Sequence, residues 1–128
     1  MLTNANLIAF IAVTDAATTR SFYRDLLGLS LVSDEPHALV FDAAGTMLRA
    51  AIVGQLAPAP HTVLGWEVPD IAAIAGKLTA AGIAPVPFAG LEQDAHGIWS
   101  APGGAKVLWF NDPDGNVLSV TQFTRQSG

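Results

Sequence analysis

The sequence contains the same pattern of elements twice, and this repeat restricts the possible folds more than any other feature. The segment Val13–Asp15 returns as Val68–Asp70 about 55 residues later. Each segment follows an apolar run and precedes residues with apolar side chains at helical spacing, which end at Gly28 in the first copy and at Gly82 in the second. The repeat therefore indicates two copies of one supersecondary unit.

Each copy is predicted to contain a strand, a helix and three further strands. In the first copy the strands are Leu7–Val13, Leu29–Val32, His37–Phe41 and Thr46–Val53, and the helix is Ala17–Leu27. In the second copy the strands are His61–Val68, Ile83–Phe88, Lys106–Phe110 and Val117–Phe123, and the helix is Asp70–Ala81. We expect one domain over residues 1–128, with module one at about 5–54, a Pro-rich linker at about 55–60 and module two at about 61–124.

One helix in each module covers one face of that module's sheet, so the other face has to be buried or to enclose a ligand. We therefore predict an α+β fold in which two βαβββ modules form mixed, curved sheets around a concave cavity, with the helices outside. The last two strands are expected to form a hairpin. Its turn contains Pro113, which presets φ, and Gly115, which supplies a left-handed φ.

Three features together resemble the vicinal oxygen chelate superfamily of glyoxalases, bleomycin-resistance proteins and extradiol dioxygenases. They are the repeat, the Phe-Tyr and Leu-Gly-Leu signature within Arg20–Leu29, and the Phe-x-Asp-Pro-Asp-Gly-Asn run that begins at Phe110. The resemblance covers about Leu7–Phe123, and it implies the βαβββ fold and a homodimer. It leaves the activity open, because the superfamily contains isomerases, dioxygenases, resistance enzymes and proteins that only bind a ligand.

Metal-dependent members of the superfamily bind one divalent ion through His and Glu side chains. The resemblance maps these positions to Ile8, Arg49, Val63 and Ser119, none of which is a typical ligand. The mapping implies that the metal site is lost and that the protein has no cofactor.

The alternative is one divalent metal ion at a displaced site that uses His61, Glu67 and His96. However, His61 and Glu67 are about 20 Å apart along an extended strand at roughly 3.3 Å per residue, which is too far for both to bind one ion.

The second module is longer than the first by about 15 residues, which lie within Ala89–Gly104. Inserted loops on a rigid scaffold often carry binding residues. We expect Trp99 to form a wall of the cavity. His96 is the candidate catalytic residue, with Asp94 close enough in sequence to pair with its ring; a hydrogen bond to the backbone is the equally open structural alternative for His96.

Alternation along the strands places the other candidate ligand-binding residues. Phe10 and Glu67 should point into the cavity, Trp109 is placed toward it, and Trp66 should face the helix of its module. Arg49 and Ser119 supply further polar groups. A salt bridge between Arg49 and Glu67 across the cavity is the structural alternative to a role in binding.

Composition excludes several other classes of protein. The net charge is −5, and the six Lys and Arg residues are scattered, so nucleic-acid binding is not expected. No apolar run is long enough to cross a bilayer, and the absence of Cys excludes thiolate sites and disulfides. The prediction is a cytoplasmic protein with no membrane partner.

These observations predict a metal-independent protein that binds or sequesters an aromatic or hydrophobic small molecule. The competing prediction is a metal-dependent lyase, isomerase or dioxygenase of the glyoxalase type with a relocated metal. Whether the protein is an enzyme stays open at this point.

Overall fold

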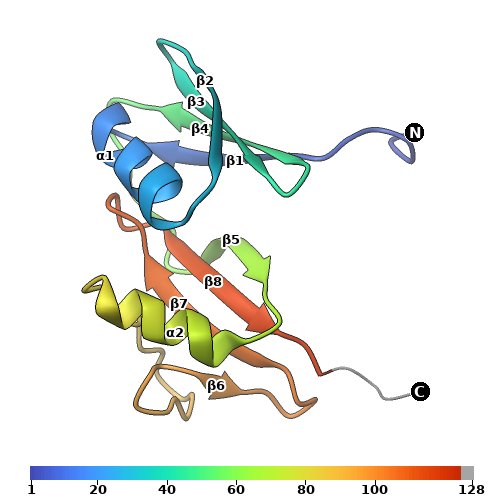
Figure 1. Cartoon of the computed structure of the whole chain (residues 1–128), viewed down its shortest axis with the longest axis vertical. Helices are drawn as coiled ribbons and strands as arrows, with labels where there is room; N and C mark the ends of the chain where they lie inside the picture. The colour runs from blue at the N-terminus through green and yellow to red at the C-terminus, as the bar shows by residue number, and fades with distance from the viewer. Residues whose placement is uncertain (125–128) are drawn as a thin grey trace. The chain divides into compact units, whose positions relative to one another are not determined.

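The computed structural model describes residues 1–124 and contains two compact units, Met1–Ala57 and a second unit that begins at Pro58 (Figure 1). The division falls inside the Pro-rich segment Gln55–Pro60. Each unit contains one four-stranded mixed sheet. Among the described residues, no helix has the length and apolar character needed to span a membrane.

The first unit has the predicted order of one strand, one helix and three strands. The elements are β1 (Ile8–Val13), α1 (Ala16–Arg20), its π-helical continuation η1 (Ser21–Leu26), β2 (Ser30–Asp34), β3 (Ala38–Ala43) and β4 (Thr46–Ile52). The sheet order is β1-β4-β3-β2, in which β1 and β4 run parallel and the other neighbours antiparallel.

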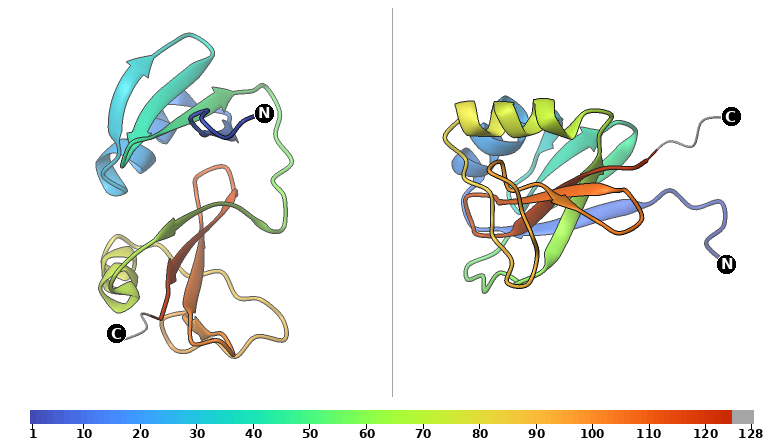
Figure 2. Two further views of the ribbon diagram at one scale, coloured as in Figure 1. Left: turned by 90° about the vertical axis from the view of Figure 1, so that its right-hand side faces the viewer. Right: turned by 90° about the horizontal axis from the view of Figure 1, so that it is seen from below.

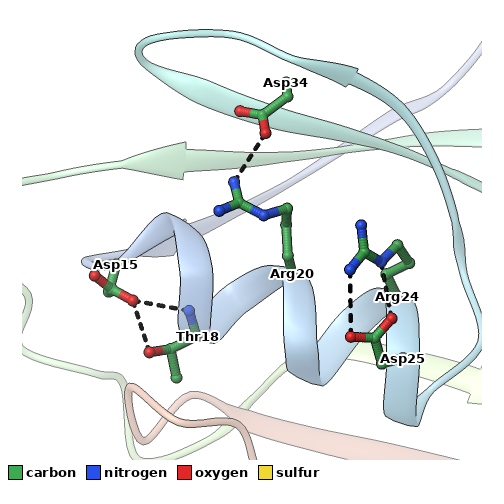
Figure 3. A network of polar contacts seen from close by, with 6 residues as sticks. All are labelled: Asp15, Thr18, Arg20, Arg24, Asp25 and Asp34. Atoms are coloured by element: carbon green, nitrogen blue, oxygen red, sulfur yellow. Dashed lines mark hydrogen bonds and ion pairs between the residues drawn. The ribbon is translucent and has the colours of Figure 1, made fainter.

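Polar contacts fix the start of the first helix and connect it to the sheet (Figure 3). The carboxylate of Asp15 accepts the backbone N–H of Thr18 at 2.8 Å and its hydroxyl at 2.6 Å, which is a typical N-cap. These hydrogen bonds, led by that from the side chain of Thr18, lower the pKa of Asp15. An ion pair of 2.8 Å joins Arg20 to Asp34 at the end of β2.

The core of the first unit lies between the helix and one face of the sheet. Tyr23 is fully buried, and its ring lies 5.9 Å from that of Phe41 on β3. Leu39, Leu48 and Val13 are also buried completely or nearly so. Alternation places Ile8, Phe10, Met47 and Arg49 on the second face of this sheet, which the helix of the first unit does not cover.

The second unit repeats this arrangement with β5 (Thr62–Glu67), α2 (Ile71–Ala80), β6 (Trp99–Ser100), β7 (Lys106–Asn111) and β8 (Val117–Gln122). The sheet order is β5-β8-β7-β6, and β5 and β8 run parallel. Helix α2 lies along one side of the sheet (Figure 2). It buries Ile71, Ala75 and Leu78, and the carbonyl of the Gln122 side chain accepts the N–H of Ile71 at 2.9 Å.

Both units confirm the predicted α+β fold of two βαβββ modules. One predicted strand, Ile83–Phe88, is wrong. This segment contacts β7 through one β-bridge, between Pro85 and Phe110, and through a hydrogen bond from the N–H of Val86 to the carbonyl of Trp109 at 2.8 Å. The prolines at positions 85 and 87 lack the N–H donors that a continuous strand requires, so the short strand β6 supplies the fourth strand.

The hairpin between β7 and β8 is confirmed, and Asp112 organises its turn. One carboxylate oxygen accepts the N–H groups of Asp114 and Asn116 at 2.9 Å each, and the other accepts the side-chain amide of Asn116 at 2.9 Å. Gly115 adopts a φ of 85°, as the turn requires. Asp112 and Asn116 are both buried, so this polar network forms part of the folded interior.

Candidate functional site

The candidate site is the face of the second sheet that α2 does not cover, which we call the open face of the second sheet. The strand register arranges its residues in two neighbouring rows. One row contains Gly65, Ser119 and Trp109, and the next contains Glu67, Thr121, Val107 and Trp99. Side chains in these rows point to the same side of the sheet because they alternate with the buried residues Leu108, Phe110, Leu118 and Val120.

Three aromatic rings meet at one end of this open face. The ring centroids of Trp99 and Trp109 are 6.2 Å apart, and the ring of Phe88 lies edge-on to Trp109 at 4.9 Å. The indole N–H of Trp109 donates to the hydroxyl of Thr62 on β5 at 2.9 Å. This hydrogen bond and the two ring contacts fix the orientation of Trp109, so the cluster forms a rigid apolar wall that remains half-buried.

Small side chains form the floor beside the aromatic wall. Gly65 has no side chain, so the backbone of β5 is exposed at this position. A Cβ atom here would lie 2.6 Å from the hydroxyl oxygen of Ser119, which is too close for any larger residue without a shift. Ser119 is 8% exposed, and its hydroxyl makes no hydrogen bond to any described residue. The floor therefore presents the unbonded hydroxyl group of Ser119 next to the exposed backbone of Gly65.

Phe10 and Arg49, the two candidates in the first unit, are direct cross-strand partners on β1 and β4. The side chain of Phe10 is 62% exposed. The guanidinium of Arg49 lies 3.3 Å from the carboxylate of Glu35, which also accepts the hydroxyl of Ser33 at 3.2 Å. The structure thus pairs Arg49 with Glu35 in its own unit, where the sequence analysis considered Glu67.

The structure separates His96 from the aromatic wall. His96 is exposed and contributes to a small hollow with Leu78, Ile83 and Leu108, which lies on the side of the sheet that α2 covers. The predicted pairing of the Asp94 carboxylate with the imidazole ring is wrong. One oxygen of Asp94 instead accepts the backbone N–H groups of His96 at 2.8 Å and Ile98 at 2.9 Å.

The hydrogen bonds of Asp94, first that from the backbone of Ile98, lower its pKa. The Asp94 carboxylate therefore stabilises the conformation of the loop by accepting these backbone N–H groups. Gln93 assists from within the same loop, because its side chain accepts the N–H of Phe88 at 2.7 Å and donates to the carbonyls of Val86 and Gly97 at 3.0 Å. These contacts position the segment that precedes Trp99.

Sequence reasoning missed Thr62, Phe88 and Glu35 as partners of the candidate residues. Thr62 is 47 residues from Trp109, and Glu35 is 14 residues from Arg49. No local motif indicates these pairs. Only the strand register could have predicted them, and the register depends on a bulge in β2 and another in β5.

Comparison with known families accounts for the repeated module. The family model described as Glyoxalase/Bleomycin resistance protein/Dioxygenase superfamily matches residues 5–120. The chain belongs to this superfamily. No curated protein matches it.

Several solved structures share the fold of this superfamily member. A glyoxalase family protein from Enterococcus faecalis is 22% identical, with a TM-score of 0.70 over 94% of this chain and 99% of the other. Lactoylglutathione lyase from Agrobacterium tumefaciens is 18% identical, with a TM-score of 0.72 over 94% and 95%. The fosfomycin resistance protein FosX from Listeria monocytogenes is 13% identical, with a TM-score of 0.74 over 94% of each chain. At these identities the likeness concerns the fold alone.

The four residues that the resemblance maps to metal-binding positions do not form a donor set for a divalent ion. Ile8 and Val63 have no donor atom, Arg49 is a cation paired with Glu35, and Ser119 offers a neutral hydroxyl. Val63 also falls at the irregular point in the pairing of β5 with β8. Within residues 1–124, no group of three or more His, Asp or Glu side chains is placed to hold a metal ion.

Proposed function

We propose that this member of the superfamily binds an aromatic or hydrophobic small molecule without a metal ion, on the open face of its second sheet. The observation that carries the proposal is the contact of Trp99 and Phe88 with Trp109 beside the floor of Gly65 and Ser119. Rigid aromatic walls with a few polar groups are typical of small-molecule sites.

The chemistry of this face supports binding more than catalysis. Tryptophan offers a large apolar surface, and pairs of aromatic rings gain roughly 0.5–1.5 kcal/mol beyond the burial of their area. The acid–base candidate His96 lies on the other side of the sheet from the wall. The role we propose is therefore to bind or sequester the ligand.

The first test of the proposal is the metal content of the purified protein, together with its melting temperature before and after dialysis against EDTA. We expect less than a tenth of an equivalent of any divalent metal, because the mapped positions lack ligands. We also expect Mn²⁺, Zn²⁺, Ni²⁺ or Fe²⁺ to change the melting temperature by no more than about 1 °C. One equivalent of tightly held metal, lost together with several degrees of stability in EDTA, would instead support the enzyme of the glyoxalase type.

The proposal includes a homodimer in the cytoplasm. The superfamily resemblance supports the dimer, and so do large exposed apolar side chains in the first unit, among them Leu7, Phe10 and Val32. Light scattering on the sample used for metal analysis should give twice the chain mass of 13.3 kDa. A mass equal to one chain at micromolar concentration would contradict the dimer and leave the proposed site untouched.

A further inference from the structure

We propose that the ligand is an aromatic amine, whose rings lie against Trp99 and Trp109 and whose protonated nitrogen binds the carboxylate of Glu67. This inference rests on the proposed function, because it specifies the charge of the molecule that occupies the same face. It follows from the positions of the wall and the carboxylate within one row of the sheet.

Glu67 and Trp99 mark the two ends of that row. Glu67 on β5 is opposite Thr121 on β8, Thr121 is opposite Val107 on β7, and Val107 is opposite Trp99 on β6. Three strand spacings separate the ends, so their Cα atoms lie roughly 14 Å apart. The side chains between them are short, and the neighbouring row contributes Gly65 and Ser119. A molecule with two fused rings and a short amine arm fits this length.

The carboxylate of Glu67 is available to a ligand. The side chain is exposed and forms no hydrogen bond or ion pair with any described residue. It lines an open hollow of about 570 Å³ with Gln122, Thr124 and Lys106, and the tryptophans of the wall do not line this hollow. Lys106 is a cation in the lining of this hollow, yet it makes no ion pair with Glu67 within the described chain. A carboxylate of this kind can only accept hydrogen bonds, so a donor cation is its natural partner.

The charge of the whole protein favours the same class of ligand. The net charge of −5 attracts cations and disfavours anionic ligands. Apolar area from the rings and charge from Glu67 thus act at opposite ends of one elongated site.

The inference can be tested with three probes that share one ring system: 2-(2-naphthyl)ethylamine, 2-(2-naphthyl)ethanol and 3-(2-naphthyl)propanoate. Isothermal titration of the wild-type protein should show that the amine binds at least 10-fold more tightly than the alcohol, with the propanoate weakest. In Glu67→Gln the amine should lose this advantage to within about 3-fold, while the affinity for the alcohol stays unchanged. The control is Asp25→Asn, which removes one exposed negative charge from the helix of the first unit and should keep the preference.

Each of the other outcomes contradicts the ligand's charge, the role of Glu67 or the proposed function itself. If the alcohol or the propanoate binds the wild-type protein as tightly as the amine does, the inference that the ligand is cationic is wrong, and the proposed function stands. If Asp25→Asn abolishes the preference as fully as Glu67→Gln, the preference comes from overall charge, and the role of Glu67 is wrong. If none of the three probes binds, both the inference and the proposed function fail.

Discussion

Replacing Trp109 by alanine is expected to lower the affinity for 2-(2-naphthyl)ethanol by about 30- to 100-fold, as judged from the typical effect of removing a central aromatic contact. Trp109 contacts both Phe88 and Trp99, and its ring is held by the hydroxyl of Thr62. The substitution therefore removes the centre of the wall and frees the two remaining rings. Isothermal titration at 25 °C, with folding checked by circular dichroism, measures the effect.

Two substitutions serve as matched controls for Trp109→Ala. Trp66 is also a half-buried tryptophan of the second sheet, but it alternates to the side covered by α2. Trp66→Phe should therefore reduce stability and leave binding unchanged, and His96→Ala should change affinity by less than about 2-fold because His96 lines the hollow on that same side. The proposed site would be wrong if Trp109→Ala bound normally, or if either control lost affinity as strongly.

The second large effect concerns the hairpin turn. Asp112→Ala is expected to reduce the free energy of unfolding by about 3 kcal/mol, because it removes at least three hydrogen bonds that donors of the turn make to a buried carboxylate. Those donors are the N–H groups of Asp114 and Asn116 and the side-chain amide of Asn116. Urea unfolding followed by circular dichroism gives the change in free energy.

The equivalent turn of the first unit supplies the control. Asp42 lies in the hairpin between β3 and β4, where its carboxylate accepts one N–H, from Gly45, at 3.1 Å in an exposed position. Asp42→Ala should cost no more than about 1 kcal/mol, since water can replace the lost partner. Equal losses in Asp112→Ala and Asp42→Ala would show that burial of the Asp112 network does not contribute the extra stability.

The sequence allowed the fold to be predicted because the signals for it are local and occur twice. Asp15 and Asp70, the last residues of the repeated segments, both cap helices, and Gly28, Gly82 and Gly115 all adopt positive φ. The apolar pattern misplaced one strand, in the segment that contains Pro85. There the prolines left one bridge in place of a strand, and the fourth strand came from the inserted loop.

The site could be predicted only in part, because its contacts depend on register and on the path of a loop. Alternation along single strands sufficed to predict that Glu67 and Trp66 point to opposite faces. It gave no information on which residue would hold Trp109 or Arg49, since Thr62 and Glu35 reach them through pairing between strands. The path of the loop has no local signal, and there the backbone N–H of His96, and not its ring, donates to Asp94.

The central claim is that the open face of the second sheet binds an aromatic ligand without metal, and nuclear magnetic resonance of the EDTA-treated protein tests it most directly. The three tryptophans give three indole N–H signals, which single Trp→Phe variants assign. Addition of 2-(2-naphthyl)ethylamine should shift the signals of Trp99 and Trp109 and leave that of Trp66 in place. A shift confined to Trp66, or one that develops only after a divalent metal is restored, would contradict the claim.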